Sequence, residues 1–146
     1  MDNEQDVGLF AINETRIQHE FMRVASDLAR WNQKLAEATE AVQLAEHKLE
    51  YIEAHIYHHI RIAAQADGEK ISENAIQARI KLDDLYRAQR DTLIKASKRL
   101  LEIKGSVQAI ITKRDMLISL GAHLREEMKG DPSIRSEKID WSTRND

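Results

Sequence analysis

The sequence has no cysteine among its 146 residues, which excludes structural disulfides, thiolate chemistry and most structural zinc sites. It also has one proline, five glycines and only 5% aromatic residues, fewer than a sheet protein needs for its turns and its core. No apolar run approaches the roughly 18 residues that cross a bilayer. The acidic segment Met1–Asp6 argues against a secretory signal peptide, so we expect a cytoplasmic protein without a membrane contact.

Charged residues, by contrast, make up 32% of the chain, which is typical of long solvent-exposed helices. The net charge of −3 is unevenly distributed. The first 14 residues carry four carboxylates and no base, whereas residues 87–114 carry eight basic and two acidic side chains. This asymmetry indicates either a polyanionic partner or a contact between the basic segment and the acidic arm, within one chain or between subunits.

An apolar repeat with alternating spacings of four and three residues runs from Ile17 to Ile56 without a break. Such a 3.5-residue repeat is typical of a coiled-coil seam. Its members are Ile17, Phe21, Val24, Leu28, Trp31, Leu35, Ala38, Val42, Ala45, Leu49, Ile52 and Ile56. We predict a helix over residues 13–64, with Asn13 or Thr15 as its N-cap.

The polar segment 65–71 contains Asp67-Gly68 and predicts a turn, after which Ser72 can cap a second helix over residues 72–128. Gly130-Asp131-Pro132 ends that helix. Its repeat is less regular, and its predicted seam is Leu82, Tyr86, Gln89, Leu93, Ala96, Leu100, Ile103, Val107, Ile110, Arg114, Leu117, Gly121 and Leu124. The two interior glycines, Gly105 and Gly121, are positions where the helix could bend or break.

Two long helices joined by a short turn predict an all-α, antiparallel, coiled-coil-like hairpin between an acidic arm (1–12) and a flexible polar tail (129–146). A second apolar stripe lies off the seam of the second helix, at Ile76, Ile80, Ile94 and Leu101. A monomeric hairpin would expose this stripe, so we predict a homo-oligomer; the alternative is that the arm or the tail covers it. The predicted oligomerisation residues are Ile94, Leu101, Ile110, Arg114 and Leu117.

Arg114 occupies a seam position, where it either pairs with a carboxylate across the interface or is exposed because the helix has left the hairpin. His55, His58 and His59 have a spacing that could share a metal, but a usable site needs further ligands. We therefore interpret them as solvated or partner-facing histidines, with a pH-dependent interface as the alternative.

No catalytic triad, phosphate-binding loop or HExxH helix is present, so we expect neither an enzyme nor a cofactor. The best candidate for function is a basic stripe on the second helix, because regularly spaced cations can follow a phosphate backbone. The alternative is a solvated face with local ion pairs. The predicted nucleic-acid-binding residues are Arg61, Arg87, Arg90, Lys95, Lys98, Arg99 and Lys113.

Several features, in this order, resemble the UvsY-type recombination mediators of tailed phages. They are the acidic arm leading into residues 12–20 (INETRIQHE), Trp31, the pair Tyr57 and Arg61 before the turn, and residues 109–114 (AIITKR) followed by an apolar stretch ending at Leu124-Arg125. The resemblance covers about residues 12–128.

The resemblance implies a small helical homo-oligomer in the host cytoplasm that binds single-stranded DNA, displaces single-strand-binding protein and loads a RecA-like recombinase. The family's Lys/Arg-rich motif near the end of the first helix is not matched, since residues 53–59 read EAHIYHH. Arg61 and the basic stripe therefore become the predicted DNA site. The second hypothesis is a scaffold or adaptor whose partners are other proteins.

Overall fold

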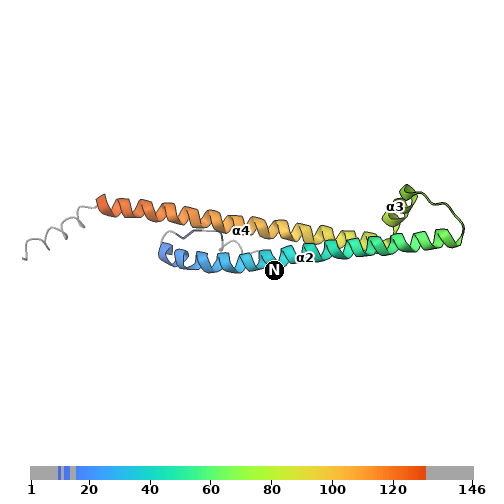
Figure 1. Ribbon diagram of the computed structural model, residues 1–146. Helices are drawn as coiled ribbons and strands as arrows, with labels where there is room; N and C mark the ends of the chain where they lie inside the picture. Colours follow the sequence, from blue (N-terminus) through green and yellow to red (C-terminus); the bar gives the residue numbers. More distant parts are fainter. Residues whose placement is uncertain (1–9, 11, 14–15, 131–146) are drawn as a thin grey trace, which may run out of the picture. The chain divides into compact units, whose positions relative to one another are not determined.

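The computed structural model describes Phe10, Ile12, Asn13 and residues 16–130, and these residues form helices without a strand. The helices are α2 (Ile17–Ala66), α3 (Glu73–Leu82) and α4 (Asp84–Gly130) (Figure 1). The all-helical prediction is thus confirmed, and most of the predicted acidic arm and polar tail lies outside the described residues. None of the described helices is long and apolar enough to cross a membrane.

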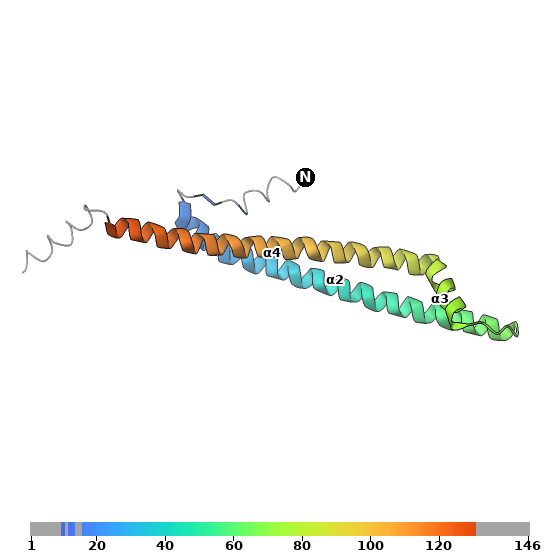
Figure 2. The ribbon, with the colours of Figure 1, turned by 90° about the horizontal axis from the view of Figure 1, so that it is seen from above.

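The chain divides into two compact units. We call residues 31–106 the central unit, and residues 1–30 with residues 107–146 the terminal unit. In each unit a segment of α2 packs against a segment of α4, and in the central unit α3 also lies beside α2 (Figures 1 and 2). Each unit has its own buried contacts.

The predicted seam of α2 is confirmed where its residues are buried, at Val24 in the terminal unit and at Trp31, Ala38, Ala45 and Leu49 in the central unit. In the central unit the two small buried alanines thus lie between the larger Trp31 and Leu49. Facing them, the buried Gln89 of α4 donates a hydrogen bond from Nε2 to the carbonyl oxygen of Ala45, at 3.0 Å. This hydrogen bond offsets the cost of burying the polar seam residue and favours one register of the two helices.

The turn after α2 is a Schellman motif, in which the N–H groups of Gly68 and Glu69 bind the carbonyl oxygens of Gln65 and Ala64 at 3.3 and 2.9 Å. Gly68 has φ = 67°, a left-handed conformation that glycine adopts without a Cβ penalty. Ser72 then caps α3, since its hydroxyl accepts from the Ala75 N–H at 3.3 Å. The predicted turn and cap are confirmed.

The prediction of one continuous second helix is wrong. The helix is interrupted at Asp83, which has an extended backbone (φ −67°, ψ 133°). Its Oδ1 accepts hydrogen bonds from the N–H groups of Leu85 and Tyr86, at 2.8 and 3.2 Å, and so caps α4. Neither Gly105 nor Gly121 interrupts α4.

The break at Asp83 changes which apolar residues are exposed. Because α3 is a separate helix, Ile76 and Ile80 are 0% and 1% exposed, and they do not belong to an exposed stripe as predicted. Leu82, predicted to lie in the seam, is instead 75% exposed. Burying two isoleucines is worth several kcal/mol, which offsets the helical hydrogen bonds lost at the break.

Candidate nucleic-acid interface

Five of the predicted DNA-binding residues lie on the part of α4 that belongs to the central unit, and all five are exposed. They are Arg87, Arg90, Lys95, Lys98 and Arg99, and we call them the basic face. Between Leu85 and Leu101 the only carboxylate is Asp91. The segment is helical because it begins at the Asp83 cap and buries Gln89 and half-buries Leu93 against the central unit, which leaves its other sides to solvent.

The ion pairs on the basic face are few and weak. Arg87 lies 3.9 Å from Asp84, while Lys98 and Arg99 lie 3.9 and 3.5 Å from Glu102. The three cationic side chains are 63–78% exposed, and such exposed pairs contribute about 0–1 kcal/mol. Within the described part of the chain, Arg90 and Lys95 make no ion pair. The cations can therefore exchange their partners for phosphates.

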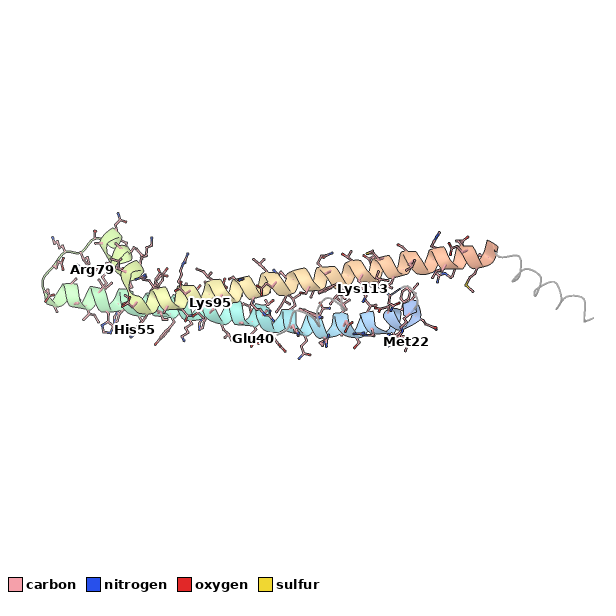
Figure 3. The ribbon with its side chains drawn as sticks, turned by 180° about the vertical axis from the view of Figure 1, so that it is seen from behind. Met22, Glu40, His55, Arg79, Lys95 and Lys113 are labelled. Atoms are coloured by element: carbon pink, nitrogen blue, oxygen red, sulfur yellow. The ribbon has the colours of Figure 1, made fainter. Side chains whose placement is uncertain are left out.

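Two shallow grooves follow the basic face. One is lined by Lys81, Tyr86, Arg87, Arg90 and Asp91. The other is lined by Arg90, Leu93, Ile94, Ser97, Lys98 and Leu101. The grooves share Arg90, so cationic side chains border a continuous, partly apolar surface along α4, as a flexible polyanion with hydrophobic bases would require. Lys95 lies on this helix in Figure 3.

The structure corrects the placement of Lys113. Predicted to belong to the exposed basic stripe, it is only 6% exposed, and its Nζ lies 2.7 Å from Glu20 Oε2 in the terminal unit. Its charge is neutralised inside the protein, so Lys113 holds α4 against α2 there and is not part of a DNA site. In Figure 3 the residue is labelled on α4.

Arg114 is exposed, but not because α4 has left its partner helix, since Leu117 further along α4 is fully buried. Its guanidinium donates to Asp115 Oδ1 at 2.9 and 3.0 Å, and its side chain is 45% exposed. The predicted seam position therefore belongs to the neighbouring Lys113. Both residues lie between the buried Ile110 and Leu117, at spacings that a helical seam permits.

Arg61 is engaged in a contact between α2 and α3. Its Nη2 donates to Tyr57 Oη at 2.8 Å and to Glu73 Oε2 at 3.3 Å, and Tyr57 Oη donates to the same carboxylate at 3.2 Å. The hydrogen bonds to Tyr57 raise the pKa of Arg61 above its ordinary value, and Glu73 adds to the effect. Because this network links α3 to α2, we leave Arg61 out of the proposed site.

The predicted oligomerisation residues have two different environments. Ile94 and Leu101 are 59% and 68% exposed in the central unit, as an intersubunit contact requires. Ile110 and Leu117, at 1% and 0%, form the core of the terminal unit and are not available to a second subunit, so their predicted role is wrong.

The sequence analysis missed a row of rings on α2, formed by Tyr51, His55 and His59. Tyr51 is 67% exposed, more than the half-buried Tyr57 and Tyr86. The signal for it is the four-residue spacing of the three rings, which places them along one side of α2 beside the seam. In the described part of the chain, no group of three or more histidine or acidic side chains is arranged to hold a metal ion.

Comparisons of this chain with protein-family models, with curated proteins and with solved structures gave no match.

Proposed function

We propose that this chain is a non-enzymatic recombination mediator. It binds single-stranded DNA through the basic face of α4, displaces single-strand-binding protein and promotes the loading of a RecA-like recombinase. The observation that carries the DNA-binding part is the set of five exposed cations on α4 with one carboxylate among them. The mediator part comes from the resemblance to the UvsY-type proteins.

The electrostatics of the basic face support a phosphate partner. Each cation that contacts a phosphate releases condensed counterions, so the logarithm of the binding constant falls with the logarithm of the salt concentration. For about five contacts on a single strand, the expected slope is roughly −3 to −4. Binding of this kind is independent of base sequence, as loading a recombinase anywhere on a strand requires.

We also propose that the chain self-associates through Ile94 and Leu101. At about 100° per residue, these two side chains lie within the basic face, with Arg90 on one side and Arg87 and Lys98 on the other. An oligomer formed through them would remove two large apolar side chains from water and bring the cations of several subunits into one assembly. Repetition raises the overall affinity by making later contacts intramolecular.

A scaffold or adaptor is the second candidate function, and the same two exposed side chains favour it. Ile94 and Leu101 line the groove that they share with Arg90 and Lys98, and a protein partner with apolar and acidic side chains would fit it. In that case the basic face would bind a protein, and the affinity for DNA would be negligible.

The DNA-binding proposal predicts that replacing Arg87, Lys95, Lys98 and Arg99 by Ala weakens binding to a labelled oligo-dT. The affinity at low salt should fall by at least about tenfold, and the salt slope should lose about 3 in magnitude, because four phosphate contacts disappear. Fluorescence anisotropy across a salt series measures both quantities. Circular dichroism should remain helical, since all four side chains are exposed.

A matched control removes four exposed cations from the terminal unit, namely Arg16, Arg23, Arg125 and Lys129. The net charge changes by the same amount, so a specific site on α4 predicts a much smaller loss of affinity. Equal losses in the two variants would mean that DNA responds only to total charge. The mediator role is tested separately, by the rate at which a RecA-like recombinase assembles on oligo-dT precoated with single-strand-binding protein.

The self-association proposal predicts that Ile94→Asp together with Leu101→Asp dissociates the oligomer, because a carboxylate in place of each apolar side chain would lose its hydration in the interface. Sedimentation velocity should show a shift to the monomer. The control is Met116→Asp with Ile118→Asp, which changes two exposed apolar residues of the same helix, 57% and 52% exposed, and should leave the profile unchanged. An oligomer that survives the first pair of changes must use another surface.

A further inference from the structure

The row of rings on α2 is an exposed surface feature that is not part of the basic face on α4. Tyr51 and His55 have ring centroids 6.2 Å apart and an interplanar angle of 28°, which is a stacked arrangement. His55 and His59 follow at 4.9 Å and 53°. Three planar side chains one turn apart therefore support one another and restrict each other's rotation, while all three remain exposed to solvent.

The surroundings of the row are free of carboxylates on its own helix. Residues 54–66 of α2 contain no acidic side chain. The preceding ones, Glu46, Glu50 and Glu53, project at least about 100° away from Tyr51. Lys48 lies on the same side, one turn before Tyr51, and is exposed. A polyanion following this side of α2 would thus meet a cation and rings without meeting a repelling charge.

A groove within the central unit continues the row toward α3 and the start of α4. Its apolar residues are Ile56, Ile60, Ala63 and Leu85, and His55, His59, Arg79 and Asp83 complete it. Figure 3 labels His55 on α2 and Arg79 on α3.

The two charged groups of the groove differ in availability. Arg79 pairs only weakly with Glu69, at 3.7 Å and with both side chains about half exposed, so it can turn to a phosphate. The one carboxylate, Asp83, is occupied as the cap of α4.

We propose that Tyr51, His55 and His59 form a stacking site for the bases of single-stranded DNA, with Lys48 and Arg79 contacting the adjacent phosphates. This inference depends on the proposed function, because it assigns a second contact to the strand that the basic face binds. Nucleobases are the ligand that fits, since planar rings stack on any base and flanking cations neutralise the backbone. The contact would give the chain a preference for unpaired DNA, whose bases are accessible.

The test compares oligo-dT with an abasic oligomer of the same length, for the native chain and for Tyr51→Ala with His55→Ala. The native chain should bind oligo-dT at least about tenfold more tightly than the abasic oligomer. In the double variant this ratio should fall to nearly 1, while the affinity for the abasic oligomer stays unchanged. Both residues are exposed and alanine favours helix, so circular dichroism should be unaffected.

Two single variants give the controls. Tyr51→Phe retains the ring and should keep the preference for oligo-dT. Leu44→Ala removes an apolar side chain, 61% exposed and two turns before Tyr51, that cannot stack, and it should leave both affinities unchanged. An equal loss of oligo-dT affinity in Leu44→Ala and in the double variant would overturn the stacking site, because it would indicate a general apolar contact.

The outcomes separate this inference from the proposed function. If the double variant still prefers oligo-dT, and binding remains salt-dependent and sensitive to the basic face, the stacking site is overturned and the proposed function stands. If neither oligomer binds at low salt, both are overturned. Photocrosslinking with iodouracil-substituted oligonucleotides should place the crosslink on the α2 peptide carrying Tyr51 and His55, and a crosslink confined to α4 would contradict the inference.

Discussion

The terminal and central units pack the same two helices in different ways. In the terminal unit a buried ion pair, Glu20 with Lys113 at 2.7 Å, accompanies the buried Ile110 and Leu117. In the central unit the corresponding polar contact is neutral, the hydrogen bond from Gln89 to the backbone of Ala45. A buried charge requires a partner, whereas an amide can be satisfied by the backbone, so the terminal unit depends more strongly on one pair of side chains.

The difference also decides what the cations of α4 can do. In the terminal unit Lys113 is buried in an ion pair with Glu20. In the central unit Arg90 and Lys95 are exposed and have no ion-pair partner among the described residues. Counting cations along the sequence therefore overestimates the surface available to a polyanion, and places it over more of α4 than the structure supports. The proposed interface is confined to the central unit for this reason.

The largest expected effect comes from breaking the buried ion pair. Lys113→Met should lower the free energy of unfolding by about 3–5 kcal/mol, because Glu20 would remain buried without its cationic partner. Urea denaturation followed by circular dichroism measures the change. The control is Lys129→Met, which removes an exposed partner of Glu126, with side chains 73% and 71% exposed, and should change stability by less than about 0.5 kcal/mol.

Adding Glu20→Leu to Lys113→Met should restore much of the lost stability, since an apolar pair of similar volume often replaces a buried ion pair without cost. Failure of the second change to restore stability would show that the lysine contributes mainly through its other contacts. Equal effects of Lys113→Met and Lys129→Met would remove the contrast between the two units.

Interrupting the cap at Asp83 has a smaller expected effect and tests a feature of the central unit alone. Asp83→Ala should cost about 1 kcal/mol, because the N–H groups of Leu85 and Tyr86 lose their acceptor. Asp83→Asn retains an acceptor and should cost only a few tenths. Thermal unfolding compares the variants, and equal losses in both would show that the negative charge, not the hydrogen bonds, stabilises the start of α4.

The seam of α2, the turn and the Ser72 cap could be predicted from the sequence, because each depends on spacing or on side chains a few residues apart. The break at Asp83 could not, because the apolar spacing continues through Leu82 and Tyr86 and masks the capping aspartate. What favours the break is tertiary: Ile76 and Ile80 become buried when α3 is separate. Local hydrogen bonds and a distant apolar contact together override the repeat.

The sequence predicts that exposed cations of the second helix form the candidate site, but it identifies only some of those cations correctly. Five exposed cations were identified correctly as a surface stripe, since exposure follows from their distance from the seam. Lys113 was misplaced because residues three and four positions after Ile110 can both face the partner helix. The contact with Glu20 of α2 decides that Lys113 is buried there and Arg114 is not. The contact of Arg61 with Glu73 could not be predicted, because Glu73 lies beyond the turn.

The smallest effects come from the two interior glycines of α4, one in each unit. Gly105→Ala should stabilise the protein by roughly 0.5 kcal/mol, because the new methyl group meets nothing within 4 Å and alanine favours helix. Gly121→Ala should stabilise less or not at all, since its Cβ would lie 3.3 Å from Cε2 of the Phe21 ring. Thermal unfolding of the two variants measures the difference. Equal gains in stability would mean that the half-buried Phe21 ring moves aside freely. The packing around Gly121 in the terminal unit would then be no tighter than the packing around Gly105 in the central unit.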